Sequence, residues 1–344
     1  MRLAIFLLLA AASASAQQWN IQTNGTDTNL RGISAVYSSG AHRHAVVWAC
    51  GSKGVILRSD DGGKSWKHLR VPGADTLDFR GIVAFADGAA YVMSIGSGDQ
   101  SRIYKTADNG ATWKLEYSDA RAAFFLDALA CVSEKRCIAL SDPVDGKFLL
   151  LSTEDGDHWR ELPRDAMPPA LPKEGVFAAS NSALIIHNNR EIYFATGGTR
   201  AARVFHSPDF GRAWTASETP IAVGNDSSGI FSLARSGGSV VVVGGDYKNV
   251  NGATGVAAFS SDRGATWKLA AHQPGGFRSG VAVAGKKTFV SVGPAGGDVS
   301  RDGGKTWTES GALNMNAVAA LGGEIWAAGA HGTVARLSYP AKSP

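Results

Sequence analysis

Short segments in which apolar and polar residues alternate follow one another along almost the whole chain, separated by Gly, Asp and Asn. Residues 79–85, 89–96 and 101–106 are three such segments in succession, and a fourth begins at Trp113. Alternation with a period of two and many β-branched residues are typical of half-buried strands. The same order of segments recurs from Phe124, Gly175, Gly229 and Phe277. The pattern predicts an all-β chain built from repeated groups of four strands.

One short motif, Ser/Thr-x-Asp-x-Gly-x-x-Trp, recurs ahead of the fourth strand of each group, and we call each copy a box. Successive box tryptophans lie 40 to 55 residues apart. This period is typical of a β-propeller, in which every repeat is one small sheet, or blade. Five copies fit the motif fully, and the third has Glu in the Asp position. The acidic and aromatic members are Asp61 and Trp66, Asp108 and Trp113, Glu154 and Trp159, Asp209 and Trp214, Asp262 and Trp267, and Asp302 and Trp307.

The chemistry of the box favours a structural role. Asp and Ser/Thr side chains accept hydrogen bonds from backbone N–H groups in tight turns, and Gly adopts the left-handed conformation that closes a hairpin. The Trp that follows can pack between neighbouring sheets. A catalytic site would not be copied six times along one chain, so we predict structural hairpins. Calcium or phosphate binding by the boxes is the alternative.

The two ends of the chain predict how the ring closes. Residues 324–338 match the second and third strands at 45–59, but no box follows them. Residues 17–23 have the pattern of a fourth strand led by Trp, without the three strands that should precede it. Pairing of these two segments would complete one blade and leave no free sheet edge. With the six blades that carry boxes, this composite blade predicts a seven-bladed propeller.

The first residues have the pattern of an export signal. Arg2 is followed by the apolar run 3–12 and by the small residues 14–16, as in a cleaved secretory signal. We therefore predict a signal peptide at residues 1–16, a single propeller domain at residues 17–344, and a periplasmic or extracellular location. No other apolar run is long enough to span a bilayer, so no transmembrane anchor is expected after cleavage.

Composition changes this picture only in detail. Gly accounts for 42 of 344 residues, as expected for a chain with many hairpins. The formal net charge is +4, and no run of Lys or Arg with interleaved aromatic residues occurs. Nucleic-acid binding is therefore not expected.

Candidate ligands for metals and cofactors are few. Cys131 and Cys137 flank a predicted hairpin turn, where facing strand positions come within disulfide reach in an oxidising compartment; the spacing leaves open whether they are bridged. Cys50 is expected to be a buried side chain. Asp142 and Asp145 lie in a segment with Pro and Gly that is predicted to be a turn, and this interpretation is favoured over a calcium site. The sequence contains no dinucleotide fingerprint, P-loop or haem motif, so no metal or cofactor is predicted.

The boxes resemble the Asp-box, or bacterial neuraminidase repeat, of sialidase-like propellers. The wider phrasing "LRGI … G.I..S.DGG.SW" resembles the photosystem II stability/assembly factor family of seven-bladed propellers, and this likeness covers nearly the whole chain after the signal. The resemblance implies a fold more strongly than a function, because Asp-boxes occur in sialidases, sorting receptors and assembly factors alike. It also implies arginines that face the central channel, and Arg31, Arg80 and Arg278 are the positions onto which this feature carries over.

The candidate site lies on the face opposite the boxes, where loops enter the inner strands. Its predicted residues are Arg31, Arg80, Arg278, Asp127, Glu174, Asp145 and Tyr247. Converging guanidinium groups suit a ligand that carries carboxylates, such as an acidic segment of a protein or peptide. The alternative is that the arginines pair with Asp127 and Glu174 and only brace the channel.

The sequence favours a non-catalytic binding or assembly factor that acts as a monomer. A sialidase-like glycoside hydrolase is the first alternative, and it needs three arginines, an acid/base Asp and a Tyr nucleophile paired with Glu. Tyr247 is the only tyrosine in the long loops of the candidate face, and it has no Glu near it in sequence. A carbohydrate-binding propeller that takes a glycan without cleaving it is the second alternative.

Overall fold

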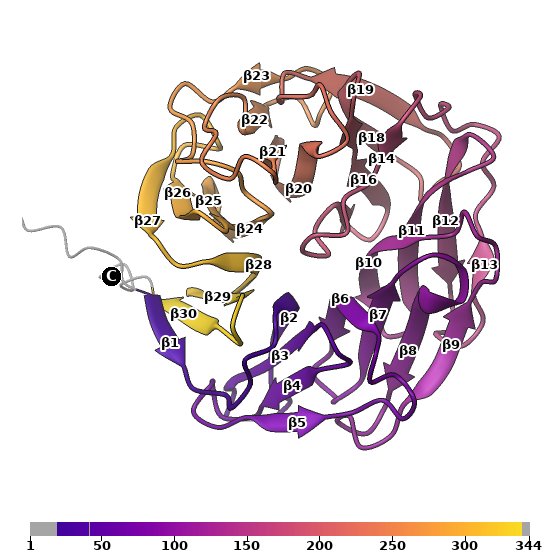
Figure 1. The fold of residues 1–344 in the computed structure, drawn as a ribbon, viewed down its shortest axis with the longest axis vertical. Coiled ribbons are helices and arrows are strands. Elements are labelled where there is room, and N and C mark those ends of the chain that lie inside the picture. The colour runs from indigo at the N-terminus through magenta and orange to yellow at the C-terminus, as the bar shows by residue number, and fades with distance from the viewer. Residues whose placement is uncertain (1–18, 41, 339–344) are drawn as a thin grey trace, which may run out of the picture.

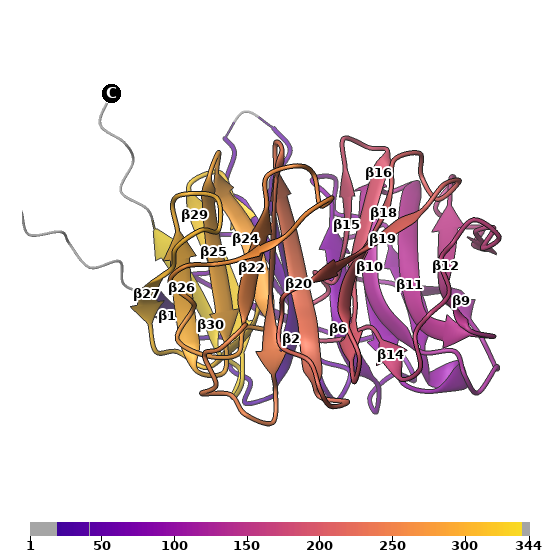
Figure 2. The same cartoon turned by 90° about the horizontal axis from the view of Figure 1, so that it is seen from above.

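The computed structural model describes residues 19–40 and 42–338, which form a ring of seven antiparallel sheets around a central axis (Figure 1). Seen from the side, the blades stand next to one another and their strands run between the two faces of a disc (Figure 2). The prediction of an all-β, seven-bladed propeller with four-stranded blades is confirmed. The only helical element among the described residues is a single 3-10 turn, η1 (Gly98–Gln100).

The first three blades each use four consecutive strands. Blade 1 contains β2 (Leu30–Tyr37), β3 (Ala45–Gly51), β4 (Ile56–Ser59) and β5 (Lys67–Leu69). Blade 2 contains β6 (Asp78–Ala84), β7 (Ala90–Ile95), β8 (Arg102–Thr106) and β9 (Lys114–Ser118). Blade 3 contains β10 (Leu126–Ser133), β11 (Arg136–Val144), β12 (Lys147–Thr153) and β13 (Arg160–Glu161).

The remaining blades complete the ring. Blade 4 contains β15 (Leu184–His187), β16 (Glu191–Ala195), β18 (Ala202–Ser207) and β19 (Thr215–Thr219). Blade 5 contains β20 (Ser228–Ser236), β21 (Ser239–Asp246), β22 (Ala257–Ser260) and β23 (Lys268–Leu269). Blade 6 contains β24 (Gly280–Gly285), β25 (Thr288–Gly293), β26 (Gly296–Ser300) and β27 (Thr308–Gly311). Blade 7 contains β28 (Met315–Leu321), β29 (Glu324–Gly329), β30 (Val334–Ser338) and β1 (Trp19–Gln22).

Blade 7 is built from both ends of the described chain, as predicted. Strand β1 pairs antiparallel with β30, and Trp19 lies opposite Leu337 (Figure 1). Trp19 is buried in an apolar cluster that includes Val290 of blade 6. The first strand therefore joins two blades, one by hydrogen bonds and the other through its tryptophan. The predicted signal peptide lies outside the described residues.

The predicted start of blade 4 is wrong. The sequence pattern places its inner strand at Gly175, but that strand is β15, which begins at Leu184. Residues 174–175 form the short strand β14 (Glu174–Gly175), which pairs with β17 (Gly197–Gly198) at the inner edge of blade 5. Glycines allow this close approach, because a Cβ on Gly197 would lie 2.6 Å from the Cα of Gly229.

The boxes form hairpin turns in which the carboxylate is used locally. In the first box, the Ser59 hydroxyl donates to Asp61 at 2.9 Å and accepts the N–H of Gly63 at 2.8 Å. The N–H of Ser65 donates to the same carboxylate at 2.9 Å. The indole N–H of Trp66 donates to the carbonyl of Gly63 at 3.1 Å, which fixes the ring at the start of the outer strand. Among the described residues, no group of three His, Cys, Asp or Glu side chains is arranged to hold a metal ion.

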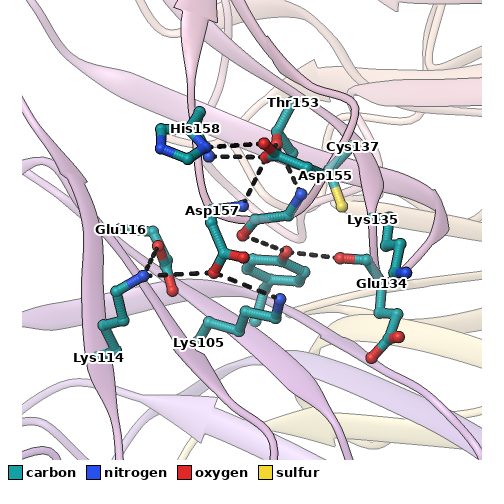
Figure 3. Close-up of polar contacts among 12 residues, drawn as sticks. Lys105, Lys114, Glu116, Glu134, Lys135, Cys137, Thr153, Asp155, Asp157 and His158 are labelled. Carbon is teal, nitrogen blue, oxygen red and sulfur yellow. Dashed lines mark hydrogen bonds and ion pairs between the residues drawn. The ribbon is translucent and has the colours of Figure 1, made fainter.

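The third box departs from its predicted alignment. Thr153 and Asp155, rather than Ser152 and Glu154, form the hydroxyl–carboxylate pair, and the N–H of Gly156 donates to Thr153 Oγ1 at 2.8 Å. Figure 3 shows the Asp155 carboxylate between Thr153 and the ring of His158. This turn is one residue shorter between its Asp and its Gly than the other copies, so the pair moves one position along the chain. Glu154 points elsewhere and pairs with Arg136.

Apolar clusters fill the space between neighbouring blades. Trp113, the box tryptophan of blade 2, packs edge-on against Trp48 of blade 1, with ring centroids 6.3 Å apart. Trp159 of blade 3 meets Tyr91 of blade 2 in the same way at 6.0 Å. Each of these boxes therefore anchors its blade to the preceding one.

Cys131 and Cys137 form a disulfide between β10 and β11, and Cys50 is buried. None of the described helices could cross a membrane.

The boxes predict a specific loss of stability in acid. Hydrogen bonds from Thr112 and Thr106 lower the pKa of Asp108 to about 2, below the value of about 3.9 for an unfolded chain. Asp108 therefore stabilises the fold above pH ~4, and this contribution is lost as the pH falls through about 2. Asp108→Asn should lower the unfolding temperature at neutral pH, and the difference from wild type should close in acid. Thermal unfolding followed by circular dichroism measures this difference.

Asp165→Asn is the matched control, because the Asp165 carboxylate is exposed and accepts no hydrogen bond among the described residues. This variant should follow the wild-type pH profile throughout. A difference between Asp108→Asn and wild type that stayed constant down to pH ~2 would contradict the stabilising role of the ionised box carboxylate.

Candidate functional site

A cavity of about 670 Å³ lies in the central channel at the face where the inner strands begin, opposite the boxes. This volume is within the range of small-molecule and peptide side-chain pockets. Residues in or next to six of the blades line it, together with the segment 176–179 that precedes blade 4, and we call this cavity the channel pocket. Its walls include Arg31, Arg80, Asp127, Asp142, Phe177, Phe231, Tyr247, Phe277, Ser279 and Asn316.

A β-bulge in five of the inner strands explains why these side chains converge. In the pairing of β2 with β3, Leu30 and Gly32 have partners on β3 but the residue between them has none. The inner strands β6, β10, β20 and β28 each contain one such unpaired residue at the equivalent place. A bulge bends its strand and redirects the skipped side chain. The skipped residues are Arg31, Arg80, Asp127, Phe231 and Asn316, and all of them line the channel pocket.

Arg31 and Arg80 lie side by side in the pocket but differ in their partners. Arg80 pairs with Asp78 at 2.8 Å and donates to the carbonyl of Ala178 at 2.8 Å. Arg31 makes no ion pair among the described residues: its Nη1 donates to Oδ1 of Asn316 at 3.3 Å, and its buried Nε has no hydrogen-bond partner. Burial lowers the pKa of Arg31 to about 10, and the positive charge of Arg80 adds to this effect.

Arg278 does not reach the pocket, contrary to the prediction. Its side chain is 1% exposed, and its Nε donates to Oδ2 of Asp298 at 2.6 Å. A second guanidinium nitrogen donates to the carbonyl of Phe277 at 3.0 Å. Ser279 takes the place in blade 6 that arginine takes in blades 1 and 2, and its hydroxyl donates to the carbonyl of Asn316 at 2.7 Å. The arginine cluster therefore has two members rather than three.

Two other predicted residues also lie away from the channel pocket. Glu174 is buried, forms an ion pair with Arg203 and accepts a hydrogen bond from Thr196 at 2.6 Å. Asp145 occupies the turn between β11 and β12 with a φ of 54°, and it lines a separate surface concavity. Neither carboxylate contacts an arginine of the pocket, so the bracing role considered for Glu174 is not realised. The glutamate fixes the β14 segment instead.

Asp127 and Asp142 form an acidic wall of the channel pocket. Asp127 is 1% exposed, and neither of its carboxyl oxygens has a hydrogen-bond partner among the described residues. Burial raises its pKa well above the usual value, and the negative charge of Asp142 adds to the shift. Asp142 accepts the N–H of Val176 at 2.9 Å, and burial raises its pKa to about 6. Asp127 therefore braces none of the three arginines by a hydrogen bond.

Aromatic rings form a further part of the pocket lining. Phe177 stacks on Phe231 with ring centroids 3.8 Å apart, and Phe277 meets Phe231 edge-on at 4.6 Å. Tyr247 contacts Phe231 at 6.1 Å and is 46% exposed, so it lies at the mouth of the pocket. Of the predicted site residues, Arg31, Arg80, Asp127 and Tyr247 are thus brought together, and Arg278, Glu174 and Asp145 are not.

A tyrosine–glutamate pair does occur, but it is not placed for hydrolysis. Tyr193 donates to Glu191 at 3.0 Å and also contacts the carbonyl of Arg263, which belongs to the fifth box. Tyr193 has no exposed surface, and burial raises its pKa above the usual value. The pair therefore lies on the opposite side of the ring from the channel pocket, and substrate cannot reach its hydroxyl.

Residues 13–290 match the DUF6242 beta propeller domain family. The chain belongs to this family. No curated protein sequence matches it significantly. Among solved structures, "YCF48 bound to D1 peptide" is similar to this DUF6242 propeller at a TM-score of 0.66 and 14% identity, covering 94% of this chain and 97% of that one.

Two further solved propellers show the same architecture. YCF48 from Cyanidioschyzon merolae has a TM-score of 0.64 and 16% identity, with 94% of this chain and 99% of that one covered. Virginiamycin B lyase from Staphylococcus aureus has a TM-score of 0.64 and 14% identity, with 94% and 100% covered. Likeness at this level of identity establishes a shared fold, on which binding proteins and enzymes both occur.

Sequence reasoning found four of the seventeen residues that line the pocket of this DUF6242 propeller and missed the rest. Asp142, Phe231 and Asn316 were not among the predicted site residues, although two of them occupy bulge positions equivalent to Arg31. Aligning the inner strands on the small residue that follows each bulge would have found Phe231 and Asn316. Asp142 gives no such signal, because it enters the pocket from the end of a second strand.

Proposed function

We propose that this protein is a non-catalytic binding protein whose channel pocket holds an acidic segment of a protein or peptide partner. The observation that carries the proposal is Arg31, a largely buried guanidinium beside Arg80 that forms no ion pair among the described residues; the nearby Asp78 carboxylate is paired with Arg80 instead. A carboxylate from a partner would add a negative charge beside the two guanidinium groups. Aromatic rings in the pocket lining provide apolar contact area for the rest of the segment.

The structural neighbours support a peptide as the partner. YCF48 has been solved with a D1 peptide bound, so a propeller of this architecture can hold a peptide. The sequence resemblance to the photosystem II stability/assembly factor family points in the same direction, and the boxes of this chain then correspond to the Asp-boxes of such propellers. We extend to this chain only the class of ligand, a peptide segment. The proposal that the segment is acidic is based on Arg31 and Arg80.

The pocket chemistry supports binding without catalysis. The channel pocket offers Tyr247 as its tyrosine, and among the described residues no Glu side chain is hydrogen-bonded to its hydroxyl. The sialidase-like alternative therefore lacks an activated nucleophile. Incubation with a fluorogenic sialoside should give no turnover above the buffer rate, and measurable turnover would overturn the non-catalytic assignment.

Titration calorimetry with two capped synthetic peptides tests the proposal. One peptide is rich in glutamate, and the other has glutamine at the same positions. The glutamate peptide should bind, more tightly at low salt than at high salt, and the glutamine peptide should bind far more weakly. Equal affinity for the two peptides would reject recognition of acidic groups.

We also propose that the protein is exported, with cleavage after residue 16. The basis is the order of Arg2, an apolar run and small residues at the start of the sequence. Intact mass spectrometry of the protein purified from periplasm or culture medium should find a chain that begins at Gln17. Recovery of the exported protein with Met1 still attached would contradict the proposal.

A further inference from the structure

The acidic wall of the channel pocket has a feature that binding of an acidic segment does not explain. Asp127 is almost fully buried, lines the cavity, and has no hydrogen-bond partner for either carboxyl oxygen among the described residues. A buried carboxyl group without a partner costs stability. Asp127 is the residue skipped at the bulge of β10, and it is one of the residues that line the cavity. The cavity is therefore the side from which a partner for Asp127 can come.

Asp142 brings a second carboxyl group to the same wall. Its Oδ1 accepts the N–H of Val176, while no hydrogen bond to its Oδ2 occurs within the described residues. The two groups raise each other's cost of ionisation, since the charge of Asp142 adds to the upward shift in the pKa of Asp127. A cation between them would reverse that cost, because it favours the ionised form of both carboxyl groups.

The surroundings of this wall suit a cation rather than a second anion. Phe125 and Phe177 line the same cavity as Asp127 and Asp142. Aromatic faces attract ammonium and guanidinium groups. Arg80 is the positive charge nearest to Asp127 that influences its pKa, but Arg80 is already paired with Asp78.

The pocket thus contains one guanidinium without an ion pair among the described residues, that of Arg31, and two carboxyl groups, those of Asp127 and Asp142. We propose that the wall formed by Asp127 and Asp142 binds a basic side chain, lysine or arginine, of the same peptide whose acidic group meets Arg31. This inference rests on the proposed function and narrows it: the ligand is a peptide segment that carries both charges. The basic group ion-pairs with the two carboxylates, and the aromatic rings contact its alkyl stem.

Two capped, glutamate-rich peptides test this inference by calorimetry. One contains a single lysine and the other has norleucine in its place, which keeps the alkyl stem and removes the charge. Wild-type protein should bind the lysine peptide roughly tenfold more tightly than the norleucine peptide. In the variant with both Asp127→Asn and Asp142→Asn, the two peptides should bind about equally. Asp226→Asn is the matched control, because Asp226 also lines the pocket but is paired with Lys248 at the rim, and it should preserve the preference.

Two further readouts separate this role from a structural one. Asp127→Asn should leave the unfolding temperature unchanged or raise it, because burial and the charge of Asp142 oppose ionisation of this carboxyl group more strongly than the backbone N–H of Asp142 and Arg80 favour it. The preference for lysine should also shrink as the pH falls through about 6, since Asp142 then takes up a proton. The charged groups that face Asp127 are Asp142 on β11 and Arg80 on β6. A marked fall in the unfolding temperature would assign Asp127 to the fold instead.

The outcomes distinguish this inference from the proposed function. If wild-type protein binds both peptides equally while Arg31→Gln weakens both, the inference is wrong and the proposed function stands. If neither peptide binds, both are wrong. A preference for norleucine would show that the acidic wall stays protonated and meets an uncharged part of the ligand, which also overturns the inference.

Discussion

Replacing Arg31 and Arg80 together with alanine should weaken binding of a glutamate-rich peptide roughly a hundredfold. A hydrogen bond to a charged group contributes about 1.5 kcal/mol or more, so each lost guanidinium accounts for about a factor of ten. Substitution of Arg31 should disturb the fold less than substitution of Arg80, because the only hydrogen-bond partner of Arg31 among the described side chains is Asn316. Arg31→Gln alone should therefore lower the affinity about tenfold and change the unfolding temperature little.

Arg278 provides the matched control for this experiment. It has the same side chain at a similar place in its blade, but it is buried against Asp298. Arg278→Ala leaves that carboxylate without its partner and should destabilise the fold by about 3 to 5 kcal/mol. While folded, this variant should bind the peptide as wild type does. The reverse pattern, with weaker binding in Arg278→Ala and normal binding in the double variant, would remove the channel arginines from the site.

Deleting residues 17–22 should destabilise the protein by several kcal/mol and broaden its thermal transition. The deletion removes β1, leaves the backbone of β30 unpaired and takes Trp19 out of the cluster between blades 6 and 7. Burial of a Trp side chain alone is worth about 3 kcal/mol or more, and an exposed strand edge invites aggregation. Differential scanning calorimetry and light scattering on the truncated protein measure both effects.

Single substitutions in β1 separate its tryptophan from its backbone. Trp19 is 8% exposed, whereas Ile21 on the same strand is 62% exposed. Trp19→Ala should therefore account for about 3 kcal/mol of the loss, and Ile21→Ala should lie close to wild type. An unchanged unfolding temperature after the full deletion would mean that closure by β1 contributes nothing to stability.

The fold could be predicted from sequence because its signals are local and repeated. A box such as Ser59 to Trp66 specifies a turn through hydrogen bonds between residues a few positions apart. The spacing of the residues that form these bonds is therefore visible in the sequence. The third box was misaligned for the same local reason, since a turn shorter by one residue moves the bonding pair to Thr153 and Asp155. The start of blade 4 was missed because the segment from β14 to β15 follows contacts with blade 5 that no local pattern records.

The site could be predicted only where the register of the inner strands was clear. In "LRGI" and "FRGI" the glycine follows the arginine directly, and a Cβ on Gly32 would lie 3.0 Å from the carbonyl oxygen of Arg80 in the next blade. In "FRSG" the glycine comes one residue later, and Gly280 is the one that lies beside the carbonyl of Asn316. Arg278 therefore falls at a core position. The small residue, and not the arginine, marks which side chain enters the channel.

Photo-crosslinking from the mouth of the channel pocket tests the central claim most directly. Tyr247 lines the pocket and is partly exposed, so p-benzoylphenylalanine at this position keeps an aromatic ring there. Lys64, an exposed residue in the first box, carries the same group on the opposite face as the control. If the pocket holds the acidic peptide, the peptide should crosslink through position 247 and not through position 64. Crosslinking through position 64 alone, or equally through both positions, would contradict binding in the channel pocket.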